Sequence, residues 1–318
     1  MDRPGAVAEL RAVVRAFASA HGPERWCVGL SGGADSLALT AVAAALRPTV
    51  ALIVDHGLQP GSAAVARAAQ EQALALGCVG AQVLGVDVGT AGGPEGAART
   101  ARYQALADAR NGLPVLLAHT LDDQAETVLL GLGRGSGARS IAGMRAFDDP
   151  WARPLLGVRR ERTRAACAEL GLTPWEDPHN ADPRYTRVRL RTEVLPLLEE
   201  VLGGGVAGAL SRTAAALRED TEALDTLAER ALPDMARDDG LAAGALAALP
   251  AAVRRRVIRL WLLEQGAVDL SAIQIHGVDA LVTAWRGQGG VAVGSDLRHA
   301  RLFASRRDGV LTMHTEPV

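Results

Sequence analysis

The hexapeptide at residues 31–36, SGGADS, carries residue types that can hold a phosphate. It follows an apolar run, Trp26 to Leu30, and precedes an Ala/Leu-rich run, Leu37 to Leu46, so the pattern predicts a strand, a glycine turn and a helix. Adjacent glycines let the backbone approach a ligand, and N–H groups at a helix N-terminus attract an anion. Asp35 would repel phosphate unless a cation such as Mg²⁺ lay between them. A glycine turn that only joins two elements is the alternative.

A second set of chemical groups follows the predicted strand Val115 to Ala118. On a helix that begins near Leu121, Asp122 and Glu126 are four residues apart. Asp123 and Glu126 are three apart, so these carboxylates can converge on one side of the helix near its N-terminus. Acids in a first helical turn also complement the helix dipole, which is the structural alternative.

The basic residues limit the chemistry in a different way. All 34 Lys+Arg residues are arginine, so a Walker-type lysine, a Schiff-base lysine and a lysine general base are excluded. The net charge is −2, and the arginines concentrate in three segments: residues 159–164, 184–191 and 254–259. Solvated helix faces are one interpretation. With Trp175 and Tyr185 nearby, the first two segments also offer the cationic and stacking groups that RNA uses.

The composition indicates a globular chain of 318 residues, long enough for two domains. No apolar run approaches the roughly 20 residues of a membrane helix, and the N-terminus resembles an amphipathic helix, so we expect no membrane association and a cytoplasmic location. Cys27, Cys78 and Cys167 are far apart in the sequence. This spacing argues against a disulfide framework, a zinc site or an iron–sulfur site.

Alternating strand and helix patterns predict an α/β fold with a parallel sheet. Thr49 to Asp55 is a second predicted strand, which places Asp55 and His56 beside the phosphate loop at the carboxyl edge of the sheet. We place a domain boundary at 198/199, with residues 1–198 forming the α/β domain. Residues 199–318 are then expected to be a smaller, mainly helical domain that ends in a hairpin around Asp308-Gly309.

Several motifs resemble known families. SGGxDS after a strand resembles the pyrophosphatase loop (PP-loop) of N-type ATP pyrophosphatases, whose fold is of the adenine nucleotide alpha hydrolase type. Residues 119–127 are similar to the HxxDDQxET motif of tRNA(Ile)-lysidine synthases, except that Thr120 stands where many members have a second histidine. Further similarities are ARxxRY from residue 98, RGSG from residue 134, and a WxEDPSN…YxRNxxR signature in which His179 and Val188 depart from the pattern.

The resemblance implies an ATP-dependent carbon–nitrogen ligase. Such an enzyme adenylates C2 of the wobble cytidine in the CAU anticodon of tRNA(Ile), and L-lysine then displaces AMP, which changes codon reading from AUG to AUA. A PP-loop tRNA thiolase is one alternative, although it should carry a cysteine pair; a non-catalytic nucleotide- or RNA-binding module is another. A homodimer is a further expectation.

The resemblance and the residue chemistry together assign the site as follows. ATP and pyrophosphate are expected at Ser31, Gly32, Gly33, Ala34, Asp35, Ser36, Asp55 and His56, with Mg²⁺ at Asp35. Lysine is expected at Asp122, Asp123 and Glu126. Catalysis is assigned to Asp35, Arg99 and Arg191, and tRNA binding to Arg160, Arg164, Arg184, Arg187, Arg255 and Arg259.

Overall fold

The computed structural model of the chain describes residues 5–22, 24–57, 61–89, 93–135 and 137–317. The chain forms two compact units, and each is discontinuous in sequence. The first unit is Met1–Leu129 with Gly143–Ser211, and the second is Leu130–Ala142 with Arg212–Val318. The expected boundary at 198/199 therefore differs from this division, because the first unit extends to Ser211 and a short earlier segment belongs to the second.

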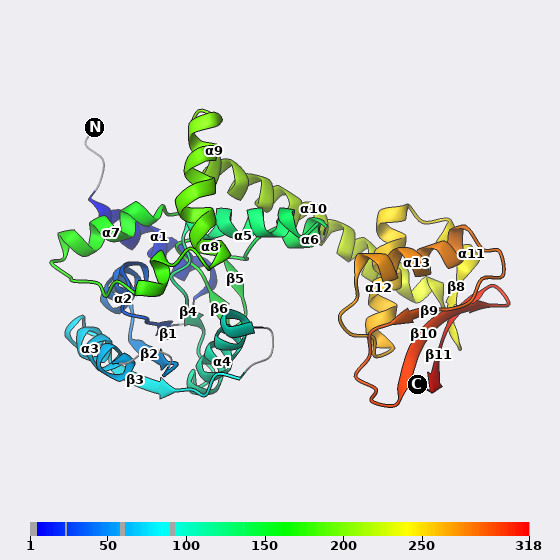
Figure 1. Cartoon of the computed structure of the whole chain (residues 1–318), viewed down its shortest axis with the longest axis horizontal. Helices are drawn as coiled ribbons and strands as arrows, with labels where there is room; N and C mark the ends of the chain where they lie inside the picture. Colours follow the sequence, from blue (N-terminus) through cyan, green and yellow to red (C-terminus); the bar gives the residue numbers. More distant parts are fainter. Residues whose placement is uncertain (1–4, 23, 58–60, 90–92, 136, 318) are drawn as a thin grey trace. The chain divides into compact units, whose positions relative to one another are not determined.

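The first unit is built on a six-stranded sheet with the order β3-β2-β1-β4-β6-β5 (Figure 1). Its first five strands pair in parallel, and β5 pairs with β6 in the antiparallel direction. The strands are β1 (Trp26–Gly29), β2 (Thr49–Asp55), β3 (Gly80–Gly85), β4 (Val115–Leu116), β5 (Phe147–Asp148) and β6 (Trp151–Ala152). Strand β6 is short, because the chain turns after Ala152.

Helices connect these strands and continue after the sheet. They are α1 (Ala6–His21), α2 (Ala34–Leu46), α3 (Ser62–Ala75), α4 (Gly93–Ala109), α5 (Leu121–Gly133), α7 (Arg160–Glu169), the 3₁₀ turn η1 (Pro178–Ala181), α8 (Thr186–Arg189), the π-helical turn η2 (Leu190–Val194) and α9 (Leu195–Val201). The predicted α/β alternation is confirmed, and the expected helices lie within a few residues of the observed ones.

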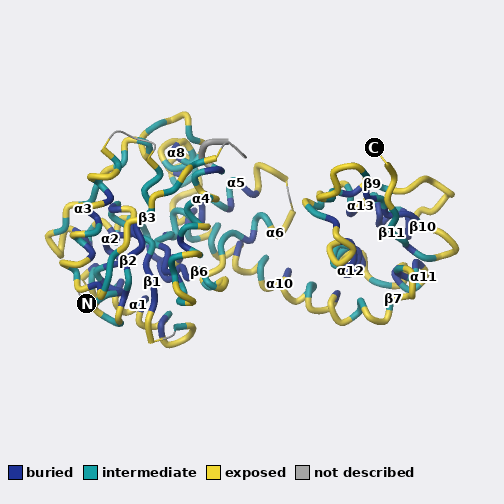
Figure 2. The backbone as a smooth tube through the Cα atoms, turned by 90° about the horizontal axis from the view of Figure 1, so that it is seen from below, coloured by how far each residue is buried: buried dark blue, intermediate teal, exposed yellow. Residues whose placement is uncertain are grey.

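Most residues of the central strands are buried, as Figure 2 shows for β1. Val28 of β1 packs in a core with helices α1, α2 and α7, whereas its neighbour Cys27 packs in a second core with Leu106 of α4. Because successive side chains of a strand point to opposite faces, helices must cover both sides of the sheet. This explains why the strands appear in the sequence as short, continuous apolar runs.

The second unit combines helices with a five-stranded sheet of order β7-β8-β11-β10-β9. The β10–β11 hairpin is the predicted one, and Asp308 and Gly309 at its turn have φ values of 47° and 81°. The sheet is larger than the expected hairpin alone. The elements are α6 (Ala138–Ile141), α10 (Val206–Met235), β7 (Ala236–Arg237), β8 (Gly240–Ala242), α11 (Ala243–Ala247), α12 (Ala251–Glu264), α13 (Ala272–Thr283), β9 (Val291–Val293), β10 (Ala300–Arg307) and β11 (Val310–Pro317).

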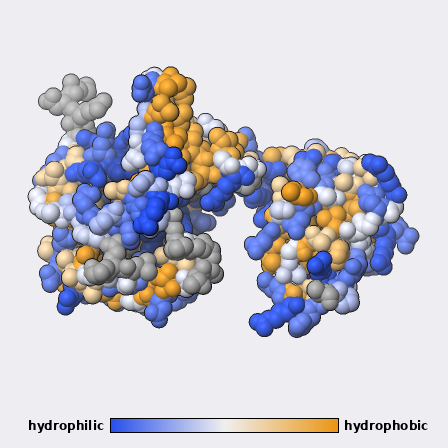
Figure 3. Space-filling model, viewed as in Figure 1, coloured by the Kyte–Doolittle hydropathy of each residue, from blue (hydrophilic) through white to orange (hydrophobic). Residues whose placement is uncertain are grey.

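One surface of the first unit is conspicuously apolar. Figure 3 shows it on α9, where Leu197 and Val201 are 58% and 69% exposed and Leu202 follows at 64%. Among the described residues, no single helix is long and apolar enough to cross a membrane. The segments Thr186–Val201 and Val206–Met235, bent by 94°, meet that criterion only as a pair, by length and composition.

Candidate active site

The phosphate loop lies where the strand order of the sheet reverses. From β1 the chain proceeds to β2 and β3 on one side, whereas β4 pairs with the other side of β1. In open α/β sheets, ligands collect at this position beyond the carboxyl ends of the strands. The loop after β1 and helix α5 after β4 therefore both follow strands at this reversal, and these two segments carry the motifs singled out from the sequence.

The loop has the backbone geometry expected of an anion site. Gly32 has a φ of 83°, a conformation that glycine adopts without strain, and its carbonyl accepts a hydrogen bond of 3.0 Å from the Trp175 N–H. The Ser36 hydroxyl donates to the Gly33 carbonyl at 3.0 Å and lies 3.1 Å from the Ser31 hydroxyl. No side chain caps the N-terminus of α2, so its first-turn N–H groups face the loop without a side-chain acceptor.

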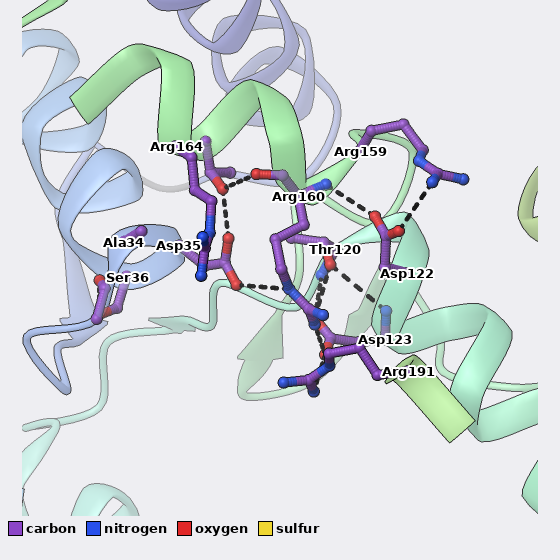
Figure 4. Close-up of polar contacts among 12 residues, drawn as sticks. Ala34, Asp35, Ser36, Thr120, Asp122, Asp123, Arg159, Arg160, Arg164 and Arg191 are labelled. Carbon is purple, nitrogen blue, oxygen red and sulfur yellow. Dashed lines mark hydrogen bonds and ion pairs between the residues drawn. The ribbon is translucent and has the colours of Figure 1, made fainter. Parts of the chain in front are cut away.

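The predicted acids do converge, and an arginine lies among them (Figure 4). The Arg160 guanidinium contacts Asp123 at 2.5 Å, Asp35 at 3.3 Å and Glu126 at 3.5 Å. We call Asp35, Asp122, Asp123, Glu126 and Arg160 the acidic cluster. Only 17% of the Arg160 side chain is exposed, so the structure does not place it on an open basic surface, where a tRNA-binding residue was expected.

The acidic cluster shifts the pKa values of its members in different directions. Burial raises the pKa of Asp35 above its usual value, although Thr163, which donates a hydrogen bond to it, and Arg160 act in the opposite direction. For Asp123, burial also favours the neutral form, but the charge of Arg160 and the hydrogen bonds from Thr120 hold its pKa below the usual value. Burial opposes the charge of Arg160, yet Asp123, Asp35 and Glu126 together raise its pKa. The Arg160 guanidinium thus favours the ionised form of both aspartates.

Asp122 and Asp123 also stabilise the N-terminal ends of helices α7 and α5, respectively. Asp122 accepts a hydrogen bond of 2.8 Å from the backbone N–H of Arg160, the first residue of α7, and lies 3.2 Å from the Arg159 guanidinium. Asp123 accepts hydrogen bonds from the backbone and hydroxyl of Thr120, at 2.8 and 2.7 Å. The Thr120 hydroxyl also accepts a hydrogen bond of 3.4 Å from the Asp123 N–H, so Thr120 caps α5 in a reciprocal arrangement like a capping box. This is a physical reason for threonine at the position where the family motif has histidine.

Glu126 is the most buried acid, with a fully inaccessible side chain. Arg191 donates to both of its carboxylate oxygens, at 2.9 and 3.3 Å, and Arg187 lies 3.6 Å away. The structure thus brings Arg191, a predicted catalytic residue, to a predicted lysine-binding acid. It also brings Arg187 there, although Arg187 was assigned to tRNA on sequence grounds.

A second group, which we call the cationic group, consists of Arg99 and Arg102 of α4 together with His56 and His119, which follow β2 and β4. The Arg99 guanidinium lies 4.8 Å from the centre of the Tyr103 ring, and Arg102 lies at 5.5 Å from the same ring. The Arg102 Nε atom and one ring nitrogen each of His56 and His119 are buried without a hydrogen-bond partner. Burial lowers the pKa of Arg102 and lowers that of His119 to about 3. The unsatisfied Arg102 N–H, with Arg99 nearby, is suited to an anionic ligand.

The remaining tRNA candidates differ widely in exposure. Arg184 and Arg164 are 82% and 62% exposed, and each has an acidic neighbour, Asp182 and Glu176 respectively. In the second unit, Arg255 is 39% exposed and lies 3.0 Å from Asp279. Burial, with the charge of Arg139, lowers the pKa of Arg259. Arg164, Arg184 and Arg255 are therefore more exposed than Arg160, whereas Arg259, like Arg160, is half-buried.

Three residues of the site were not recognised from the sequence. Thr163 donates to Asp35, Arg159 pairs with Asp122, and His119 contributes an unsatisfied nitrogen. A signal for Thr163 was available, because it lies one turn after Arg160 on the arginine-rich helix and so shares its face. Among the described residues, no three His, Cys, Asp or Glu side chains form a group that could hold a metal by themselves.

The fold and the site together define a PP-loop, ATP-using domain. The family described as PP-loop domain matches residues 7–198, and the family described as TilS substrate binding domain matches residues 241–306. A U34-tRNA thiolase, NcsA from Methanococcus maripaludis with its [4Fe-4S] cluster, has the same fold: the TM-score is 0.55 at 18% identity, over 67% of this chain and 80% of that chain.

Full-length relatives give the narrower family. The chain is 71% identical to a tRNA(Ile)-lysidine synthase of Mycolicibacterium paratuberculosis, over 100% of both chains. It is 70% identical to that of Mycobacterium tuberculosis strain H37Rv and 69% identical to that of Mycobacterium leprae, again over 100% of both chains. The chain belongs to the tRNA(Ile)-lysidine synthase family.

Proposed function

We propose that this chain ligates L-lysine to C2 of the wobble cytidine in the CAU anticodon of tRNA(Ile), at the expense of ATP. The observation that carries the proposal is the meeting of an anion-binding loop and an acidic cluster at one strand-order reversal. One group suits ATP phosphates, and the other suits a cationic amino acid. A ligase that activates an RNA base and then admits an amine needs both.

The reaction proceeds in two steps. The C2 oxygen of the cytosine attacks the α-phosphate of ATP, which forms a C2–O–AMP link and releases pyrophosphate. The ε-amino group of lysine then attacks C2, AMP departs with the oxygen, and the amine loses a proton. Adenylation converts a poor leaving group into a good one. The role of the chain is to hold three substrates in line and to stabilise the charge that moves to the phosphates.

The nucleotide subsite combines the phosphate loop with the cationic group. Residues 31–36 supply N–H and hydroxyl donors, and Asp55 and His56 end the neighbouring strand β2. Arg99, which donates to the Tyr103 hydroxyl at 3.2 Å, is proposed to clamp a phosphate. The unsatisfied nitrogens of Arg102 and His56 support an anion there.

Asp35 fits a role as the protein ligand of Mg²⁺. Mg²⁺ commonly binds through one or two carboxylates together with substrate phosphates, so a group of three acids is not required. The Asp35 side chain is 26% exposed, lies at the N-terminus of α2 beside the loop, and has acceptor sites beyond its two present hydrogen bonds. The ion would neutralise phosphate charge during adenylation.

The acidic cluster is the proposed lysine subsite. Asp123 is 16% exposed and Glu126 is buried, and both face cations already. Arg191, bound to Glu126, would lie beside the reacting amine and is the proposed catalytic arginine of this side. Asp122, which is engaged with the start of α7, is proposed to shape the subsite as well as to attract the ammonium.

Contacts with tRNA are proposed for Arg164 and Arg184 in the first unit and, separately, for Arg255 and Arg259 in the second. Arg160, which belongs to the acidic cluster, and Arg187, which lies beside it, are not assigned to tRNA binding, because both contact Glu126. The cytoplasmic location and the homodimer remain predictions.

The test is direct. The purified chain is incubated with ATP, radiolabelled lysine and unmodified tRNA(Ile) bearing a CAU anticodon, with tRNA(Met) of the same anticodon as the control. We expect ATP-dependent labelling of tRNA(Ile) alone. Labelling of neither tRNA, at any lysine concentration, would refute the proposal.

A thiolase activity is not favoured. Cys27, Cys78 and Cys167 are buried, and the described residues contain no cysteine-bearing group with metal-ligand geometry. Burial raises the pKa of each of these thiols to about 11, which keeps them protonated and poorly nucleophilic.

A further inference from the structure

The three guanidinium nitrogens of Arg160 each face a different acid, and these acids come from two helices (Figure 4). Its Nε atom faces Asp35 of α2, and its terminal nitrogens face Asp123 and Glu126 of α5. Asp35 belongs to the nucleotide side of the site, and the other two acids belong to the amine side. Arginine suits this position because its planar fork can address separate carboxylates at the same time.

The backbone of Arg160 is held in place by two hydrogen bonds. Its backbone N–H donates to Asp122 at 2.8 Å, and its carbonyl accepts a hydrogen bond of 2.7 Å from the Thr163 hydroxyl, which also bonds Asp35. The guanidinium stands at the end of a flexible stem, so the side chain can redistribute its contacts while α7 stays in place.

A lysine ammonium needs the same acids. Asp123 and Glu126 have exposed fractions of 16% and 0%, so an incoming ammonium cannot bind them without sharing them with Arg160 or replacing it there. Once Arg160 releases these acids, its remaining partner is Asp35, next to the phosphate loop. The positive charge that lysine displaces is thereby moved toward the phosphates of ATP.

We propose that Arg160 is a positioning residue that couples the two subsites: lysine at the amine subsite turns the Arg160 guanidinium toward the nucleotide, so that each substrate strengthens the binding of the other. This coupling rests on the proposed ligase function. The free energy for the coupling comes from the replacement of the Arg160 guanidinium by the lysine ammonium at Asp123 and Glu126. Because coupling between binding sites is reciprocal, ATP must strengthen lysine binding by the same factor.

The measurement is a ratio of dissociation constants. The full chain, saturated with tRNA(Ile), is titrated with a non-hydrolysable ATP analogue by calorimetry, with and without saturating lysine. For the wild type, we expect lysine to tighten analogue binding by a factor within roughly 5 to 150, the usual range for coupled sites. Arg160→Gln removes the charge and should reduce the factor to about one. Arg160→Lys keeps the charge without the fork and should give an intermediate factor.

Arg162→Gln is the matched control. Arg162 lies on the same helix and also makes an ion pair, with Glu9 of α1 at 2.7 Å, so its replacement removes a similar ion pair outside the acidic cluster. We expect this variant to keep the wild-type factor. A merely structural role for Arg160 would weaken both ligands in Arg160→Gln and leave the factor unchanged.

Each outcome is decisive. An Arg160→Gln variant that keeps the wild-type factor overturns the coupling. If that variant does not fold, Arg160→Lys carries the test, and a wild-type factor in it overturns the proposal equally. A wild type that forms lysidine yet has a factor of one refutes the coupling alone, whereas a wild type that forms no lysidine refutes the function on which it rests.

Discussion

At the scale of single residues, the site is organised by which acid faces which cation. Asp35 faces Thr163 and Arg160, and Glu126 faces Arg191. These acids were all identifiable from the sequence, because their spacing within two motifs determines where they lie. Of their partners, Arg191 was also predicted as a site residue, but Thr163 was not identified and Arg160 was assigned to tRNA binding. Nothing in a run of arginines says which member turns inward, since that choice depends on buried carboxylates that come from elements distant in the sequence.

The first residue-scale prediction concerns Asp35. In Asp35→Ala we expect adenylation to be lost while the fold is kept, because Arg160 retains Asp123 and Glu126 as partners and Thr163 retains the Arg160 carbonyl as its acceptor. The readouts are ATP-dependent release of AMP with tRNA and lysine, and circular dichroism for the fold. Normal AMP release would contradict the proposed metal role of Asp35.

A second prediction separates the amine side from the nucleotide side. Asp123→Asn removes one negative charge at nearly constant shape, and losing a charged hydrogen-bond partner should cost about 1.5–3 kcal/mol. The KM for lysine should therefore rise by roughly 10- to 150-fold, with a smaller change in the KM for ATP. Steady-state kinetics with each substrate varied in turn measures both. If the KM for ATP rose more than that for lysine, Asp123 would belong to the nucleotide subsite.

At the scale of elements, α5 positions the acids Asp122, Asp123 and Glu126, because this helix begins just beyond the carboxyl end of β4. Thr120 and Asp123 hold this end by reciprocal hydrogen bonds. In Thr120→Ala we expect a loss of about 1 kcal/mol in the free energy of unfolding, the usual cost of losing an N-cap. Urea unfolding is the measurement, and Thr120→Ser, which keeps the hydroxyl, is the control. A cost no greater in alanine than in serine would argue against the cap.

The buried position of His119, just after β4, predicts that the free energy of unfolding depends on pH. Burial lowers the pKa of His119 to about 3, whereas the unfolded chain takes up this proton near pH 6.5. As the pH falls below 6.5, the unfolded state therefore binds a proton that the folded state refuses, and stability decreases toward acid. His119→Gln should reduce the loss of stability between pH 7.5 and pH 5 by roughly 1–2 kcal/mol.

Denaturant unfolding at several pH values tests this expectation, with His276→Gln as the control because His276 is exposed on α13. If the free energy of unfolding fell equally with decreasing pH in the wild type and in His119→Gln, His119 would not be the cause of the loss of stability in acid.

Element prediction from the sequence succeeded where local signals agreed. The β1–turn–α2 segment and the Asp308-Gly309 hairpin were predicted correctly, because glycines and apolar runs specify them locally. Helix α13 was missed because it is apolar around most of its circumference and shows little periodicity, although its capping box at Ser271 and Gln274 was a usable signal. The five-stranded sheet was missed because β7 and β8 are very short and because β8 pairs with β11, which lies far along the chain.

At the scale of the whole molecule, a chain of net charge −2 must still hold a polyanion. We expect Arg164→Ala/Arg184→Ala and Arg255→Ala/Arg259→Ala each to weaken tRNA binding and to flatten the log–log dependence of affinity on salt. The slope should change by about one unit for each phosphate that an arginine no longer neutralises. Filter binding across a salt series gives the slopes.

The matched control is Arg11→Ala/Arg15→Ala, which removes two exposed arginines of α1 for which no tRNA contact is proposed. Its slope should equal that of the wild type. If both test pairs also kept the wild-type slope, the arginines would be solvated helix faces and the proposed tRNA contacts would be refuted.

The second unit owes part of itself to an earlier stretch of the chain. Residues 130–142 belong to it, and Arg139 pairs there with Asp225 while Arg218 donates to the Ala142 carbonyl. In genetic terms, a single crossover at residue 211 would transfer residues 212–318 without residues 130–142, which belong to the same unit. A chimera of two relatives made at that point would therefore combine the two pieces of the second unit from different parents.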